Sequence, residues 1–162
     1  MDRRQIAAVL ALERLSIPLR LDTFEYRLLA QKVLYLAQAG GLGIGYPYSW
    51  YLRGPYSSAL TRDLFASQAD PASMEDVTQN WKLDDNAGER LDRIRKLLQP
   101  PKGIRLWDWS ELLASVHFLI DRKQAAQDTE EIERRLRAFG KNFSRREVED
   151  AFECLKEYSL LR

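Results

Sequence analysis

Repeated signals for the start of a helix constrain the fold of this chain more than any other feature. In a capping box, an aspartate or serine precedes a glutamate by three residues, and each side chain accepts a hydrogen bond from the other residue's backbone amide. This spacing occurs in the pairs Asp22 with Glu25, Asp108 with Glu111, Asp128 with Glu131 and Ser144 with Glu147. The pairs predict helices over residues 23–39, 109–122, 129–139 and 144–158. Apolar periodicity adds helices over residues 3–15, 57–67 and 87–98.

Between the helices predicted over residues 23–39 and 57–67 the pattern changes to that of a strand. Aromatic residues alternate from Tyr46 to Leu52, and because a lone strand is unstable, we expect it to pair with Trp81–Leu83. Residues 66–80 are polar and are predicted to form a mobile loop. The sequence therefore predicts a mainly α protein, a compact helical bundle with a minor two-stranded β element. We expect a single domain over residues 1–162, with a helical core in residues 1–101 and a three-helix C-terminal segment in residues 102–162.

Composition excludes several classes of function. The chain has 25 basic and 24 acidic residues, so no overall field attracts nucleic acid or an anionic membrane. One cysteine, Cys154, and one histidine, His117, exclude an internal disulfide and a four-ligand zinc site, and no cofactor is indicated. His117 lies in an apolar helical run and is interpreted as a partly buried structural histidine. Glu13 and Arg14 interrupt the first apolar run, so we expect a cytoplasmic protein without a membrane partner.

The stretch RGPYSS, residues 53–58, predicts a strand-to-helix corner that can also bind a partner. Gly54 can adopt backbone angles that other residues resist, and Pro55 suits the first turn of a helix. The stretch is either a buried corner capped by Ser57, or a helix start whose amides and nearby arginine hold a carboxylate or phosphate; both can coexist. We expect Tyr48 and Trp50 to pack under the helix over residues 23–39. The predicted partner-binding residues are Tyr51, Arg53, Gly54, Pro55, Tyr56 and Ser57.

The run QKVLYLAQAG followed by SWYLRGPYSSALTRDL resembles the Panacea/SocA antitoxin domain and the related YwgA-like proteins, over about residues 25–64. In those families a helix with a Lys-hydrophobic-hydrophobic-Tyr pattern precedes an aromatic strand and a Gly-Pro turn. Panacea domains more often carry Gly-Pro-Val, so Gly-Pro-Tyr-Ser in this chain favours the YwgA-like branch. The resemblance implies a mostly helical, non-enzymatic module that recognises another protein, as an antitoxin or as a subunit of a prokaryotic defence complex.

The C-terminal segment supports a different hypothesis. Its three predicted helices have the layout of a DNA-binding helix-turn-helix, and basic residues are concentrated around the connection between the last two helices. The predicted recognition helix is nevertheless rich in acidic residues, which repel phosphates, so we interpret the basic residues as a solvated face or a protein contact. A nucleic-acid-binding regulator is the second hypothesis, and an enzyme of unrecognised type is the third. The possible nucleic-acid contacts are Arg134, Arg137, Lys141, Arg145 and Arg146.

Overall fold

The computed structural model describes residues 1–161, which contain eight helices and one two-stranded sheet. The helices are α1 (Arg3–Arg14), α2 (Phe24–Ala39), α3 (Ser58–Gln68), α4 (Pro71–Asn80), α5 (Asp85–Leu97), α6 (Leu106–Asp121), α7 (Thr129–Ala138) and α8 (Arg145–Glu157). The strands β1 (Ser49–Tyr51) and β2 (Gly54–Tyr56) lie between α2 and α3. The prediction of a mainly α bundle with a minor two-stranded element is confirmed.

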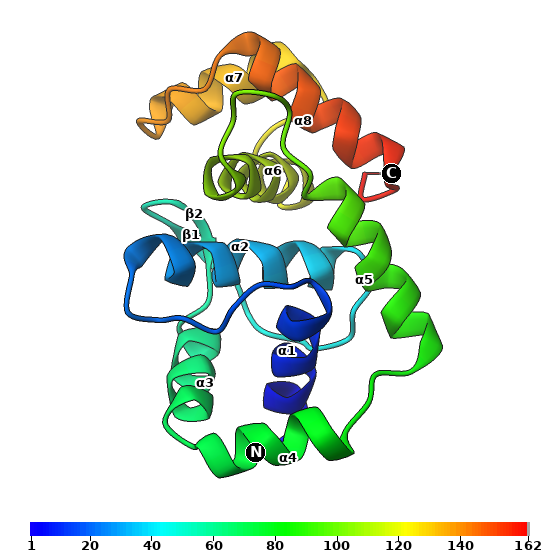
Figure 1. Ribbon diagram of the computed structural model, residues 1–162. Coiled ribbons are helices and arrows are strands. Elements are labelled where there is room, and N and C mark those ends of the chain that lie inside the picture. Colours follow the sequence, from blue (N-terminus) through cyan, green and yellow to red (C-terminus); the bar gives the residue numbers. More distant parts are fainter. Residues whose placement is uncertain (162) are drawn as a thin grey trace.

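Helices α2 and α6 form the centre of the molecule and pack against each other (Figure 1). Residues 29–37 of α2 and 109–119 of α6 are buried without interruption. Because successive residues of a helix point in different directions, an unbroken buried run means that the helix is enclosed on all sides. Helices α1, α3 and α4 lie on the α2 side of the molecule, α7 and α8 cover α6, and α5 connects the two sides (Figure 1).

One hydrophobic core extends through both sides of this arrangement. It runs from Ala8 on α1 to Leu160 beyond α8, and it includes residues from every helix except α4. A small second cluster, Ile6 and Val9 with Val77, joins α1 to α4. Residues 1–101 and the C-terminal segment therefore share one core, with α6 as the common element. Within residues 1–161 no helix combines the length and the apolar character needed to cross a membrane.

The capping box at the start of α8 is confirmed. Ser144 Oγ accepts from the Glu147 amide at 3.1 Å, and Glu147 Oε1 accepts from the Ser144 amide at 2.9 Å. Helix α7 also begins after Asp128 as predicted, although the glutamate of that pair, Glu131, accepts from the Ala126 amide instead of from the cap.

The other two predicted boxes are wrong. Helix α2 is capped by Thr23, whose hydroxyl accepts from the Tyr26 amide, and not by Asp22. Helix α6 begins at Leu106, two residues before Asp108, because Leu106 packs against the core and extends the helix backwards. Glu111 is consequently free of any capping role and is buried inside the protein.

The prediction for the strand partner is also wrong. Strand β1 pairs antiparallel with β2 in a hairpin, with Ser49 opposite Tyr56, and residues 81–83 lie outside any helix or strand. Residues 66–80, predicted as a mobile loop, instead form the end of α3 and all of α4. Asp70 caps α4, Pro71 occupies its first turn, and the buried Val77 attaches it to α1.

Candidate functional site

The hairpin turns at Leu52 and Arg53, and Gly54 then passes directly over α6. Gly54 has a φ of +96°, and a Cβ added there would lie 2.5 Å from Ser115 Oγ. Both the backbone angle and the close approach require glycine, which confirms the predicted role of Gly54. Pro55 belongs to β2 and not to the first turn of a helix, so that part of the prediction is wrong.

A lysine of α2 lies beneath this corner. Lys32 is 1% exposed, and its Nζ donates a hydrogen bond to the Pro55 carbonyl oxygen at 2.6 Å. The pKa of Lys32 is lowered to about 7, mainly by burial; the charge of Glu111 opposes this shift, and the charges of Lys141 and Arg53 add to it. The amine therefore changes its charge near neutral pH, whereas an exposed lysine stays charged.

Lys32 is one of four charged residues that we call the cation cluster. The cluster consists of the cations Lys32, Arg53 and Lys141 and one carboxylate, Glu111. Glu111 Oε2 lies 3.4 Å from Lys141 Nζ, and Glu111 Oε1 lies 3.8 Å from Arg53 Nη1. Glu111 and Lys141 are buried, whereas Arg53 is exposed. Within residues 1–161, Glu111 Oε1 and Ser115 Oγ make no hydrogen bond. Three basic side chains are thus gathered around one carboxylate and incompletely satisfied polar atoms.

A groove of about 510 Å³ opens beside the hairpin, between α2 and α3. Four of its lining residues, Phe24, Tyr51, Leu52 and Phe65, are large and apolar yet exposed by 48%, 59%, 77% and 46%. The charged residues in its lining are all basic: Arg27, Lys32 and Arg53. We call this feature the hairpin groove; it is apolar along most of its length and positively charged where it meets the cation cluster.

The wall of the hairpin groove is fixed by hydrogen bonds from Gln31 of α2. Its Nε2 donates to Thr61 Oγ1 at 2.7 Å and to the Ser57 carbonyl at 2.9 Å, while its Oε1 accepts from the Ser57 amide at 3.0 Å. Thr61 Oγ1 donates in turn to the hydroxyl of Tyr56 at 2.9 Å. Tyr56 stacks against Tyr51, with ring centroids 5.5 Å apart. This wall is therefore held in place before any partner binds.

The structure separates the predicted partner-binding residues into two groups. Tyr51, Arg53 and Tyr56 line the hairpin groove, with Tyr51 and Arg53 exposed and Tyr56 half-buried, as predicted. The other three, Gly54, Pro55 and Ser57, are buried and build the corner, and their contact with a partner stays a prediction. The Ser57 amide is bonded to Gln31, which removes it from the predicted anion site.

The aromatic residues of the first strand also differ in part from the prediction. Tyr48 packs against Tyr35 of α2 with ring centroids 5.1 Å apart, as expected. Trp50 does not pack under α2, because the hairpin directs it towards α6 and α7. There it contacts Phe118 and Phe139, with ring centroids 5.7 and 4.7 Å away.

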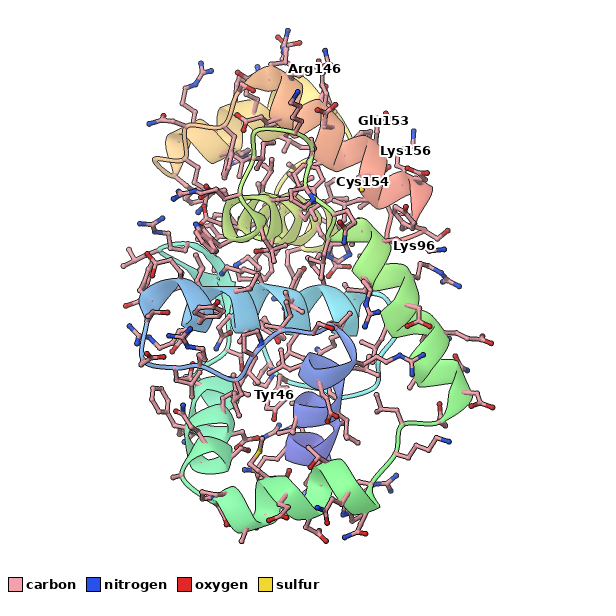
Figure 2. The ribbon with its side chains drawn as sticks, viewed as in Figure 1. Tyr46, Lys96, Arg146, Glu153, Cys154 and Lys156 are labelled. Atoms are coloured by element: carbon pink, nitrogen blue, oxygen red, sulfur yellow. The ribbon has the colours of Figure 1, made fainter. Side chains whose placement is uncertain are left out.

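The basic residues proposed as nucleic-acid contacts are mostly engaged within the protein. Arg137 and Arg145 both bond Glu133, and Arg146 lies 3.5 Å from Asp150. Arg134 is exposed on α7, whereas Lys141 is buried against Glu111 and cannot reach a phosphate from that position. Figure 2 shows Arg146, Glu153 and Lys156 along the outer side of α8, so charges of both signs occupy the predicted recognition helix.

The histidine and the cysteine occupy structural positions. His117 is buried, its Nδ1 lies 2.7 Å from the Tyr35 hydroxyl, and burial lowers its pKa. Cys154 lies on the side of α8 that faces α5 (Figure 2), where its Sγ donates weakly to the Leu97 carbonyl at 3.8 Å. Burial raises the pKa of Cys154 to about 11, which keeps the thiol protonated. Among residues 1–161 no three His, Cys, Asp or Glu side chains are grouped as metal ligands.

Comparisons of the chain with protein-family models, with curated proteins and with solved structures find no match. The resemblance to Panacea and YwgA-like proteins therefore stays a prediction from the sequence.

Sequence reasoning missed three residues of the site: Lys32, Glu111 and Ser115. The signal for Lys32 was a single charge inside the apolar run LLAQKVLYLA, since a lysine on an enclosed helix must find an internal acceptor. Glu111 was assigned to a capping box, and nothing in the sequence placed Ser115 beneath the glycine of the hairpin.

Proposed function

We propose that this chain is a non-enzymatic, cytoplasmic regulatory module that binds another protein through the hairpin groove. One observation carries this proposal: Phe24, Tyr51, Leu52 and Phe65, from three different elements, expose large apolar side chains around a single groove. Clustered exposed apolar residues mark interaction sites, whereas isolated ones are common on any surface. The chemistry of the groove is that of a docking site for an apolar segment of a partner.

The construction of the groove also favours binding. Gln31 and Thr61 hold Tyr56 in place, and the Arg53 guanidinium lies 5.5 Å from the centre of the Phe24 ring, across the groove. A pre-organised surface loses little conformational entropy when a partner binds. Tyrosine and arginine are also the residue types that most often dominate the energy of protein interfaces.

The biological setting rests on the resemblance of residues 25–64 to antitoxin-related proteins. We place the chain as an antitoxin-like protein or as a subunit of a prokaryotic defence complex, with a toxin or another subunit as its partner. Nucleic acid is a weaker candidate, because Arg137, Arg145 and Arg146 are engaged by carboxylates and Lys141 is buried.

A random peptide library displayed on phage tests the groove. We expect selection on the wild-type protein to yield apolar peptides whose affinity falls about tenfold or more in the variants Phe24→Ser and Leu52→Ser, because both remove an exposed anchor. Trp81→Ser is the matched control, since Trp81 is an equally exposed aromatic residue outside the groove. Peptides that bind all three variants like the wild type would show that the groove is not the docking site.

A further inference from the structure

The charged end of the hairpin groove contains more positive charge than its own neighbours balance. Lys32, Arg53 and Lys141 surround a single carboxylate, Glu111, whose Oε2 faces Lys141 at 3.4 Å and whose Oε1 lies 3.8 Å from Arg53. A protonated lysine has three hydrogen-bond donors, and Lys32 has one acceptor among the described residues, the Pro55 carbonyl. A buried amine with too few acceptors gives up its proton more readily, in line with the lowered pKa of Lys32, and an anion that approaches it favours the charged form again.

The position of these cations indicates where that anion would come from. Lys32 and Arg53 both line the hairpin groove; Arg53 is exposed, whereas Lys32 is buried, so an anion in the groove meets Arg53 first and Lys32 behind it. Lys141 lies on the other side of Glu111, above the ring of Trp50, with its Nζ 5.7 Å from the ring centre. Arg27 is held by its own bond to the Leu21 carbonyl at 2.7 Å. The cations available to an occupant of the groove are therefore Arg53 and Lys32.

The apolar lining limits the kind of anion. Phe24, Tyr51 and Leu52 adjoin Arg53, so a group that binds there must bring an apolar body next to its negative charge. A strongly hydrated phosphate would leave these side chains uncovered. A carboxylate pairs with the cations, and aromatic or aliphatic groups next to it cover the apolar lining. A protein segment that carries an acidic residue beside apolar ones provides both.

We propose that the hairpin groove recognises a carboxylate of the partner segment, held by Arg53 and Lys32, while the neighbouring apolar side chains of that segment cover Phe24, Tyr51 and Leu52. The carboxylate is an acidic side chain of that segment. This inference rests on the proposed function and specifies what the groove selects.

The first test compares two probes that differ only in charge, hydrocinnamate and its amide, hydrocinnamamide. Amide-resolved NMR of the full chain follows the resonances of the hairpin and of the first half of α2. We expect both probes to shift these resonances, with the carboxylate binding about tenfold more tightly, the gain typical of one charge-assisted hydrogen bond.

Variants of the two cations make the test specific. Arg53→Gln removes an exposed guanidinium and Lys32→Met replaces the buried amine by an apolar group of similar length; each should abolish the preference for the carboxylate. Arg62→Gln is the control, because it removes one positive charge from an exposed position of α3 outside the groove. If Lys32→Met does not fold, the exposed Arg53 still decides the result.

The outcomes separate this inference from the proposed function. Equal binding of the two probes in the groove would overturn carboxylate recognition while leaving the groove as an apolar docking surface. Binding of hydrocinnamate at other resonances, or no binding at all, would also overturn it. The phage selection tests the proposed function separately from these probes. The proposed function fails if the library yields no peptide that binds in the groove.

The source of the carboxylate can be separated with the selected peptides. Each is synthesised with its acidic side chains changed to amides, and in a second series with only its C-terminus amidated. We expect affinity to fall about tenfold in the first series and to stay unchanged in the second, whereas the reverse result would show that the groove recognises a free C-terminus and would overturn the assignment to a side chain. Unchanged affinity in both series would overturn the inference.

Binding should also depend on pH in a defined direction. The charged groups that face Lys32 are Glu111 on α6, Arg53 in the hairpin turn and Lys141 between α7 and α8. A bound carboxylate favours the charged form of the amine, so the complex takes up a proton above pH 7, where free Lys32 has lost much of its charge. Affinity for hydrocinnamate should fall as pH rises above 7 in the wild type and stay flat in Lys32→Met.

Discussion

At the scale of single residues, Gly54 sets how closely the hairpin approaches the central helices. Its φ of +96° and the 2.5 Å between an added Cβ and Ser115 Oγ are two separate obstacles to any side chain. The first is a property of the backbone and the second of one neighbouring atom. The two contributions can therefore be separated by changing the neighbour.

Gly54→Ala should lower the free energy of unfolding by about 1 to 3 kcal/mol through backbone strain, with a further loss from the collision with Ser115. In a Ser115→Ala background the collision is removed, so the same substitution should cost less. Urea denaturation of the wild type, Gly54→Ala, Ser115→Ala and the double variant measures how much the cost of Gly54→Ala changes between the two backgrounds. An equal cost in both backgrounds would mean that Ser115 Oγ does not block the position.

Lys32 gives the protein a pH dependence that the chain's composition does not suggest. Its pKa is lowered to about 7 by burial, from an ordinary value of 10.5. Above pH 7 the unfolded state keeps this proton while the folded state loses it, so the free energy of unfolding rises with pH.

The wild-type protein should therefore gain stability relative to Lys32→Met as pH rises above 7, with a slope of at most about 1.4 kcal/mol per pH unit for one proton. Urea denaturation of both proteins at several pH values, kept below the range where tyrosines titrate, measures the slope of the difference. A flat difference would show that Lys32 keeps its charge in the folded state.

At the scale of elements, the connection between α7 and α8 is attached to α6 by one buried ion pair. Lys141 Nζ lies 3.4 Å from Glu111 Oε2, and both side chains are buried. Breaking such a pair from one side leaves an unmatched charge in the interior, whereas replacing both partners leaves none.

Lys141→Met should therefore destabilise the protein by about 2 to 4 kcal/mol, because Glu111 loses its nearest cation. The double variant Lys141→Met with Glu111→Gln should recover a large part of this loss. Guanidinium denaturation of the wild type, both single variants and the double variant gives the coupling energy. Additive effects would contradict the pairing.

The helices found from the sequence are those with a capping-box spacing at their start or with apolar periodicity. Helix α4 was not predicted because its segment, PASMEDVTQN, contains only Met74 and Val77 as large apolar residues, which are enough to pack it against α1 outside the main core. The partner of β1 was not predicted correctly, because the distant residues 81–83 were chosen in place of the segment that follows β1 directly. Gly54–Tyr56 was interpreted as a corner, although a two-residue turn at Leu52 and Arg53 makes it the second strand of a hairpin.

The exposed part of the site could be predicted, and its buried part could not. Strand alternation placed Tyr51 and Arg53 on the open side of the hairpin. The cation cluster depends on contacts between residues far apart in the chain, such as Lys32 with Pro55 and Glu111 with Lys141. No local pattern encodes such contacts, because they arise only when α2 and α6 are packed.

At the scale of the whole molecule, α6 is the element that the two sides have in common. It packs against α2 on one side and against α7 and α8 on the other, and residues 109–119 are buried throughout. A fragment that lacks α6 would expose the face of α2 that contains Tyr35, whose hydroxyl lies 2.7 Å from His117 Nδ1 and whose ring centre lies 6.2 Å from that of Phe118.

Residues 1–101 expressed alone should therefore fail to form a native core, because the apolar surface of α2 loses its cover. NMR of the fragment should show poorly dispersed amide resonances, while the full chain unfolds in one cooperative transition. A well-dispersed spectrum of the fragment, or two separate transitions of the full chain, would show that the two parts fold independently.

The cation cluster has a consequence for how this sequence can change over evolutionary time. Its four members come from α2, the hairpin turn, α6 and the connection between α7 and α8, and Glu111 is the single acid beside three cations. Loss of Glu111 alone leaves buried cations unmatched, and loss of Lys141 alone leaves Glu111 without its nearest cation, so changes at these two positions are selected together. Positions 111 and 141 should therefore co-vary in divergent descendants of this chain, whereas the exposed Arg53 should change independently. Saturation mutagenesis with selection for folded protein should recover replacements of Glu111 and Lys141 in pairs more often than singly.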